Sequence, residues 1–272
     1  MYRFPQLSSA LKHFGREILN KMKFGLIGDP IALSMSPALF RAGYPASVHS
    51  YELFPASNIE EAFSIIRNEN IAGVNVTTPF KESVLKYAQN IDNLAKEIEA
   101  ANLLIRSGNE FTAYNTDYCG VRESLKKFAT NGGRVAIIGC GGAGRAASIA
   151  ARDLGFDVII FNRDKIKAKN FAVKNSLEFA GIEQFSKIGC DAKIIIDTLP
   201  VSTNIYDLIS LKSKIIFEAK YSKPALKMKC IKDGAFYVPG TLWLLNQAVP
   251  SFRMFTGEEP NISAMELLTE SC

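Results

Sequence analysis

Three glycines with a fixed spacing are the residues of this sequence that point most clearly to chemistry. Gly139, Gly141 and Gly144 form a Gly-x-Gly-x-x-Gly pattern directly after the apolar run Val135–Ile138, and a second apolar run follows at Val158–Phe161. A strand, a glycine turn, a helix and a strand within about thirty residues is the setting in which this pattern binds a dinucleotide. The first glycine makes the turn, the second lets the backbone approach a pyrophosphate, and the third lets helix and strand pack. The unpaired N–H groups of the helix N-terminus would then face the phosphates.

The residues after the second strand indicate which dinucleotide this site prefers. In NAD sites an acidic residue stands there and binds the ribose 2′-hydroxyl. This sequence has Asn162 and Arg163 instead, followed by Lys165, Lys167 and Lys169. A guanidinium suits a 2′-phosphate because it forms two parallel, charge-assisted hydrogen bonds. We therefore expect NADP in preference to NAD, although some of these lysines would form only a solvated basic helix face.

Lys81 stands at a position where helix stability alone would favour another residue type. Thr78 and Pro79 follow an apolar strand, and they have the pattern of the N-cap and the first residue of a helix. Lys81 would then lie in the first turn, where the positive end of the helix macrodipole disfavours a cation. Residues that break a local rule often do so at functional sites. The alternative is a lysine whose ammonium group simply points into solvent.

Two further segments place polar residues at predicted helix starts. Asp117, within Asn115-Thr-Asp-Tyr-Cys-Gly120, begins the helix that leads into the glycine unit, where an acid also stabilises the helix by itself. Ser36, followed by Pro37, has the pattern of an N-cap with proline at the first helical position. Each is ordinary alone. Their positions make them candidates, because ligands of open α/β sheets gather beyond the carboxyl ends of strands.

The elements that must position these residues alternate between strands and helices. This alternation predicts two α/β domains with mostly parallel sheets and a cleft between them. From Gly240 onward the pattern is helical, with a break at Pro260. Strands are predicted at 24–28, 49–54, 72–76, 102–106, 110–114, 135–138, 158–161, 193–199, 214–219 and 235–238, and helices at 37–42, 59–68, 80–90, 93–100 and 117–129.

Length, composition and charge exclude several other classes of protein. With 272 residues, of which 47% are hydrophobic and 22% charged, the chain suits one large or two modest globular domains. The net charge of +5 comes from scattered lysines without interleaved aromatic residues, so we expect an anionic small molecule and no nucleic acid as partner. No apolar stretch approaches the length of about eighteen residues that a membrane span needs.

Cysteine and histidine usage argues against a metal site. The five cysteines form no Cys-x-x-Cys pair, and the two histidines, His13 and His49, lie far from any cysteine pair. The odd number of cysteines suggests free thiols in a reducing cytoplasm.

Residues 1–21 are basic and lack the apolar core of a signal peptide. This N-terminal extension could be an additional amphipathic helix, an extension from an upstream start codon, or a transit peptide.

Taken in order, these motifs resemble those of the shikimate dehydrogenase family. The resemblance implies reversible, NADPH-dependent reduction of 3-dehydroshikimate to shikimate, a step in chorismate and aromatic amino-acid biosynthesis. It also implies a substrate-binding and catalytic domain at 22–117 plus 241–272, to which the C-terminal helices return, and a Rossmann-type NADP-binding domain at 118–240. The matching stretches are Gly28-Asp-Pro-Ile-Ala-Leu-Ser-Met-Ser-Pro37, Asn75-Val-Thr-Thr-Pro-Phe-Lys81, Ala101-Asn102, Asn115-Thr-Asp117, Gly139-Cys-Gly-Gly-Ala143, Asn162-Arg163 and Gly240 to Gln247.

Carried over residue by residue, the resemblance implies a complete site. Lys81 and Asp117 would be the catalytic pair: hydride delivery to a ketone leaves an oxygen that needs a proton, which the Lys81 ammonium could donate while Asp117 holds it. The substrate contacts would be Ser34, Ser36, Thr77, Asn102, Tyr221 and Gln247. The cofactor contacts would be Gly139, Cys140, Gly141, Gly142, Ala143, Asn162, Arg163, Lys167, Ala219 and Gly240.

Two other functions stay open. A quinate/shikimate dehydrogenase that uses NAD is favoured if Arg163 points away from the ribose. The other is a non-catalytic sensor of a shikimate-like ligand, and the presence of both Lys81 and Asp117 argues against it.

The sequence differs from the family pattern at Leu33, Leu103 and residues 197–200, 218–220 and 242–243. A monomer and a homodimer both remain open.

Overall fold

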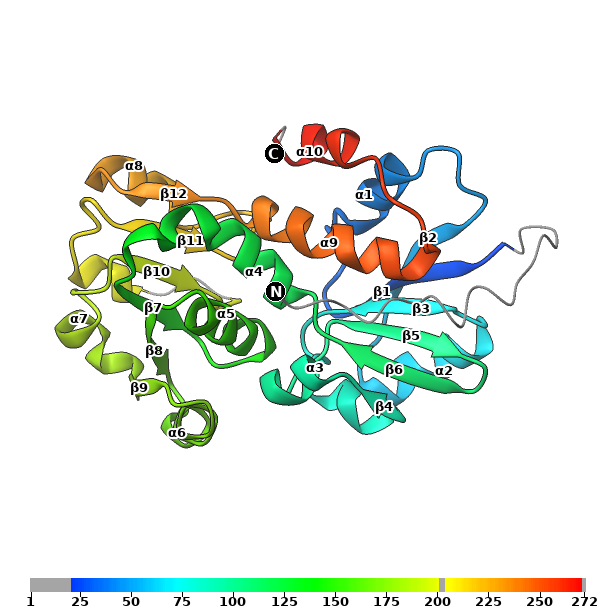
Figure 1. Cartoon of the computed structure of the whole chain (residues 1–272), viewed down its shortest axis with the longest axis horizontal. Helices are drawn as coiled ribbons and strands as arrows, with labels where there is room; N and C mark the ends of the chain where they lie inside the picture. The colour runs from blue at the N-terminus through cyan, green and yellow to red at the C-terminus, as the bar shows by residue number, and fades with distance from the viewer. Residues whose placement is uncertain (1–20, 201–203, 271–272) are drawn as a thin grey trace.

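The protein is built around two separate six-stranded sheets, with helices packed against them (Figure 1). The computed structural model describes residues 21–200 and 204–270, so the predicted N-terminal extension lies outside the described residues except for Lys21. The first sheet has the order β2-β1-β3-β5-β6-β4, in which only β5 is antiparallel to its neighbours. Its strands are β1 (Lys23–Gly28), β2 (Ser50–Pro55), β3 (Gly73–Val76), β4 (Asn90–Ile91), β5 (Leu103–Ser107) and β6 (Glu110–Tyr114).

The second sheet is parallel throughout, with the order β12-β11-β10-β7-β8-β9. The strand order reverses between β7 and β10, which is the switch point at which such sheets bind ligands. This is the strand order of a Rossmann-type unit, which the family resemblance implied. Its strands are β7 (Arg134–Ile138), β8 (Asp157–Asn162), β9 (Glu178–Gly181), β10 (Ile194–Asp197), β11 (Ile215–Glu218) and β12 (Phe236–Val238).

Both faces of the second sheet are buried, which explains its continuous apolar strands. Val135 and Ile137 of β7 pack into a cluster with α5 (Gly142–Asp153) and α6 (Lys165–Lys174). Ala136 and Ile138, on the opposite face, pack with α7 (Phe185–Ile188) and α8 (Lys227–Asp233). Because successive residues of a strand point to opposite faces, a strand covered on both sides needs no polar alternation.

The first sheet is also covered on both faces. On one face lies α2 (Ile59–Asn68), whose start is set by Asn58, since the Asn58 side chain accepts a hydrogen bond from the Glu61 N–H at 2.9 Å. The helix α3 (Asn93–Ile98) leads from β4 toward β5. The other face carries three helices, α1 (Ser36–Gly43), α9 (Gly240–Thr256) and α10 (Ile262–Glu270).

The C-terminal helices therefore pack on the first sheet, as Figure 1 shows for α10 beside α1. Phe252 and Phe255 of α9 join the same core cluster as Phe24 of β1, and the rings of Phe24 and Phe255 stack with centroids 4.7 Å apart. The helix α4 (Asp117–Leu125) lies against α9 where the chain passes from one sheet to the other. The exact division of the chain at 117/118 and 240/241 stays a prediction.

One predicted helix is wrong. Residues 80–90 form a turn, a short 3-10 helix at Ser83–Tyr87 and then β4, which pairs with β6. Strand pairing and the burial of Phe80 and Val84 in the first core outweigh local helix propensity here. Lys81 consequently lies in the turn and not in a first helical turn, so the macrodipole argument for this lysine does not apply.

Two smaller predictions also need correction. Met35, not Ser36, occupies the N-cap position of α1, and no side chain caps this helix. The helix predicted at 117–129 ends at Leu125 and continues as a 3-10 helix at Lys126–Asn131. Among the described residues, no helix is long and apolar enough to cross a membrane.

Candidate active site

Lys81 and Asp117 form a largely buried ion pair between two segments of the first unit. The Lys81 Nζ lies 2.6 Å from Asp117 Oδ2, and the two side chains are 14% and 3% exposed. Lys81 comes from the turn after β3, and Asp117 is the first residue of α4. The alternative of a lysine that points into solvent is therefore wrong. We call these two residues the Lys81–Asp117 pair.

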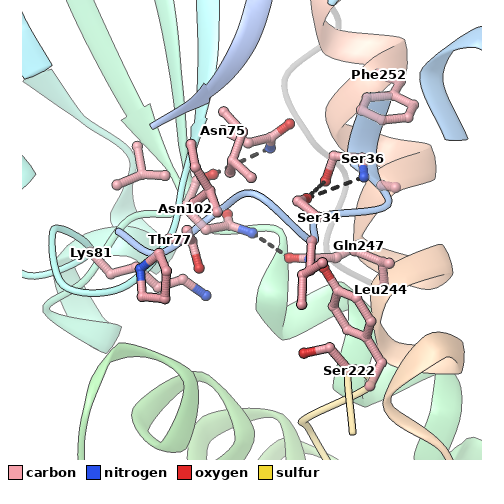
Figure 2. A pocket seen from close by; sticks show the side chains of 17 residues that line it. Ser34, Ser36, Asn75, Thr77, Lys81, Asn102, Ser222, Leu244, Gln247 and Phe252 are labelled. Carbon is pink, nitrogen blue, oxygen red and sulfur yellow. Dashed lines mark hydrogen bonds between the residues drawn. The ribbon is translucent and has the colours of Figure 1, made fainter. Parts of the chain in front are cut away.

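The six residues predicted to contact a substrate all line one polar pocket together with Lys81 (Figure 2). They come from distant parts of the chain: the loop after β1, the start of α1, the residue after β3, the residue before β5, the loop after β11, and α9. Figure 2 shows Asn102 and Gln247 extending toward one another beside Ser34. The lining is rich in hydroxyl and amide groups, which suits a small polyhydroxylated or carboxylated molecule. The six are Ser34, Ser36, Thr77, Asn102, Tyr221 and Gln247.

Asn102 uses its polar atoms within the protein. Its Nδ2 donates to Thr116 Oγ1 at 3.0 Å and to Gln247 Oε1 at 2.7 Å, and its Oδ1 accepts from the Thr116 N–H at 2.7 Å. This contact fixes the Gln247 amide beside the pocket that both residues line. Asn102 therefore orients Gln247, and it is only 2% exposed itself.

Asn75 and Ser222 line the same pocket but were missing from the predicted site. Asn75 Oδ1 accepts from the Tyr51 hydroxyl at 2.9 Å, and its Nδ2 donates to Ser251 Oγ at 2.7 Å. A polar residue inside the apolar strand Gly73-Val-Asn-Val76 was a visible signal for Asn75. We find no comparable sequence signal for Ser222.

The glycine turn has the geometry that a dinucleotide site needs. Gly139 has a φ of +107°, a conformation that glycine adopts at little cost. A Cβ atom at Gly144 would lie 2.1 Å from the Gly139 carbonyl oxygen, so helix and turn pack too closely for any side chain. At Gly141, by contrast, a Cβ atom would meet nothing within 4 Å. The three glycines therefore fit their predicted roles, and the space over Gly141 can admit a pyrophosphate.

The glycine turn lies next to the Lys81–Asp117 pair. A Cβ atom at Gly142 would lie 2.8 Å from the Cβ of Lys81. One cleft is lined by Thr77, Lys81 and Asp117 from the first unit and by Ala143, Ala219 and Gly240 near the second sheet. Because ligands on the two sides would meet in this cleft, the arrangement permits transfer between a nucleotide and a small molecule.

Several predicted cofactor residues shape the turn itself. Asn162 accepts a hydrogen bond from the Cys140 N–H at 3.2 Å and donates to the Asp164 carbonyl at 2.9 Å, which ties the end of β8 to the turn. Burial raises the pKa of the Cys140 thiol, which disfavours the reactive thiolate form. A Cβ atom at Gly240 would lie 2.5 Å from the Ala219 carbonyl oxygen, so only glycine allows this approach of backbones.

The two predicted basic cofactor residues differ in their surroundings. Arg163 is exposed just after the end of β8. Lys167 Nζ lies 2.6 Å from Glu82 Oε1, and the same carboxylate is 3.4 Å from Arg145. The ammonium of Lys167 thus already has a carboxylate partner that comes from the first unit. Of the two side chains, that of Arg163 is the more exposed.

Metal-ligating side chains do not gather anywhere in residues 21–200 and 204–270: no group of three or more His, Cys, Asp or Glu side chains there could hold a metal ion.

The fold and the cleft together define a two-domain α/β protein that joins a dinucleotide-binding unit to a polar small-molecule pocket. Comparisons with known proteins agree with this class. Residues 26–104 match the model of the shikimate dehydrogenase substrate binding domain, and residues 129–211 match that of the acetohydroxy acid isomeroreductase NADPH-binding domain.

Known relatives identify the family. A shikimate dehydrogenase (NADP(+)) of Methanobrevibacter smithii is 33% identical over 265 residues, which cover 89% of this chain and 94% of the relative. The structure of shikimate dehydrogenase from Aquifex aeolicus is 29% identical, with a TM-score of 0.81 and coverage of 93% and 98%. That of shikimate 5-dehydrogenase from Thermus thermophilus in complex with NADP(H) and shikimate is 25% identical, with a TM-score of 0.78 and coverage of 92% and 99%. The chain belongs to the shikimate dehydrogenase family.

Proposed function

We propose that this protein is an NADP-dependent shikimate dehydrogenase, an oxidoreductase that reversibly reduces 3-dehydroshikimate to shikimate on the route to chorismate and the aromatic amino acids. One observation carries the proposal. The Lys81–Asp117 pair lines a cleft that also reaches the glycine turn, and Lys81 lines the hydroxyl-rich pocket as well. Membership of the family supports the choice of substrate and cofactor.

The residues around the glycine turn fit a bound NADP. The backbone of Gly141, Gly142 and Ala143 would hold the pyrophosphate at the N-terminus of α5. Asn162 would keep the turn in shape, and the exposed guanidinium of Arg163 would bind the 2′-phosphate. When bound, the reduced cofactor supplies a hydride to the substrate carbonyl carbon.

Lys81 is the proposed proton donor. As the carbonyl becomes a hydroxyl, its oxygen takes a proton from the Lys81 ammonium, which leaves a neutral amine that solvent or a neighbouring group reprotonates. Before transfer, the same ammonium would stabilise the growing negative charge on this oxygen. Asp117 holds Lys81 in place through the 2.6 Å contact. In the oxidation of shikimate the proton moves in the opposite direction.

The polar pocket would orient the ring. Ser34 and Ser36 lie together, with their Oγ atoms 3.2 Å apart, and form a small hydroxyl cluster suited to a carboxylate. Thr77 and Tyr221 line both this pocket and the cleft, so they are placed to contact ring hydroxyls nearer the reacting carbon. Gln247, oriented by Asn102, would donate its amide N–H groups.

We further propose the domain limits given above, 22–117 plus 241–272 and 118–240, and a reducing cytoplasm as the compartment. Packing of α9 and α10 on the first sheet supports the discontinuous first domain. Four cysteines that the structure describes, Cys119, Cys140, Cys190 and Cys230, are free thiols, which is typical of reducing compartments.

The test is an initial-rate assay of the purified protein. Shikimate with NADP should give NADPH at a rate well above that with NAD, and above that of either cofactor with quinate. The Lys81→Ala variant should lose turnover by about 10²–10⁴-fold, the usual contribution of general acid–base catalysis, with a modest change in KM. Absence of turnover with shikimate and NADP would refute the proposed function. Undiminished turnover of the variant would refute only the role of Lys81.

A further inference from the structure

Trp243, in α9, contacts the Lys81–Asp117 pair although it was not among the predicted site residues. Its indole Nε1–H donates to Asp117 Oδ1 at 3.2 Å, while Lys81 Nζ lies 2.6 Å from Oδ2 of the same carboxylate. Each carboxylate oxygen therefore has its own partner, from a different segment of the chain. We propose that Trp243 is a positioning residue, which fixes the orientation of the Asp117 carboxylate and, through it, that of the Lys81 ammonium.

The indole itself is held firmly enough to serve this purpose. Trp243 is 4% exposed, and its ring lies 5.4 Å from that of Phe217 at an interplanar angle of 52°. On α4, a Cβ atom at Gly120 would lie 2.6 Å from Trp243 Cδ1, so the indole occupies the space that the missing side chain leaves. A donor confined in this way can restrict the carboxylate, because hydrogen bonds are directional.

Helix stability alone does not account for this contact. Asp117 is the first residue of α4, where a negative charge is favourable whichever way the carboxylate points. The two observed contacts, by contrast, select one orientation of its two oxygens. Trp243 also lines the same cleft as Lys81 and Asp117, so the contact lies within the proposed site. The inference therefore rests on the proposed function, since it requires the Lys81–Asp117 pair to act in the reaction.

Steady-state kinetics of Trp243→Phe test the role, because phenylalanine keeps an aromatic ring but lacks the N–H. We expect kcat to fall about 10-fold, the usual effect of losing a hydrogen bond to a charged group, with KM for shikimate and NADP changed less than about 2-fold. The matched control is Phe156→Leu, which disturbs the same core cluster away from the cleft and should lower thermal stability but not kcat. A Trp243→Phe variant with the kcat of the parent enzyme would overturn the proposal.

A double-mutant cycle separates positioning from packing. If Trp243 acts through Asp117, Trp243→Phe should lower kcat in the parent enzyme but not further in the Asp117→Asn background. An equal loss in both backgrounds would show that the indole acts by packing and would refute the inference.

A spectroscopic measurement tests the contact without any turnover. Trp243 is the single tryptophan of the sequence, so the ultraviolet resonance Raman signal of the indole N–H comes from this residue alone. Asp117→Ala should shift this signal toward that of a weaker hydrogen bond, and an unchanged signal would overturn the inference even if Trp243→Phe does not fold. Failure of the protein to oxidise shikimate with NADP would refute the proposed function but leave this measurement valid.

Discussion

Breaking the Lys81–Asp117 pair should separate its contribution to stability from its contribution to catalysis. At 2.6 Å and an effective dielectric constant of about 20, the attraction between the two charges is about 6 kcal/mol. Much of this is offset by the cost of removing both charges from water. A single substitution loses the attraction but leaves the other charge buried, whereas a double substitution removes both charges.

We therefore expect an asymmetric pattern in urea unfolding. Lys81→Met leaves Asp117, 3% exposed, without its cation and should cost about 3–5 kcal/mol, as is usual when one partner of a buried pair is removed. Asp117→Asn leaves Lys81 without its carboxylate, but Lys81 is 14% exposed and can contact water more easily than Asp117. We therefore expect Asp117→Asn to cost less stability than Lys81→Met. The double variant should unfold within about 1 kcal/mol of the parent protein.

Turnover should not follow stability in this series. Lys81→Met and the double variant should lose about 10²–10⁴-fold in kcat, because neither has a proton donor. Asp117→Asn should also lose turnover, because Lys81 is then no longer held in place. Lys23→Met is a suitable control, since its pair with Glu69 is exposed and should matter little to either property. If the two single losses of stability simply add in the double variant, the reasoning about paired burial is wrong.

Three further predictions address the second unit. Arg163→Leu should raise KM for NADP by about 10–100-fold while leaving KM for NAD nearly unchanged. Lys167→Met should have a smaller effect, because the Lys167 ammonium already has a carboxylate partner. Initial rates with both cofactors test these two expectations. Gly141→Ala should keep the melting temperature but weaken NADP binding, because a Cβ atom there meets nothing in the protein. Gly144→Ala should lower the melting temperature, because its Cβ would lie 2.1 Å from a backbone oxygen. Equal melting temperatures of the two variants would contradict this expectation. Burial, with a smaller effect of a neighbouring carboxylate, raises the pKa of Asp197 to about 6, so its ionisation destabilises the fold as the pH rises from about 4 through 6. Asp197→Asn should therefore gain about 2–3 kcal/mol in unfolding free energy at pH 7.5 but little at pH 4, and a gain that does not depend on pH would refute this assignment.

The glycine turn and most of the surrounding strands were predictable because their signals are local. The spacing of Gly139, Gly141 and Gly144 and the apolar run before it depend only on neighbouring residues, and the structure confirms the strand, turn and helix. The hairpin of β5 and β6 and the helix α2 were predictable for the same reason. Local rules failed at residues 80–90, where pairing of β4 with β6 replaced the expected helix.

The sequence by itself therefore determined the two α/β units, the glycine turn and the types of residue available for catalysis. Only the tertiary structure decided which side chains meet: Lys81 pairs with Asp117 across 36 positions, and Trp243 reaches Asp117 across 126. The tertiary structure also brings Asn102 into hydrogen-bond contact with Gln247 and pairs the Glu82 carboxylate with the Lys167 ammonium. The physical reason is that such contacts depend on how whole helices and sheets pack, and residue spacing along the chain carries no direct record of that packing.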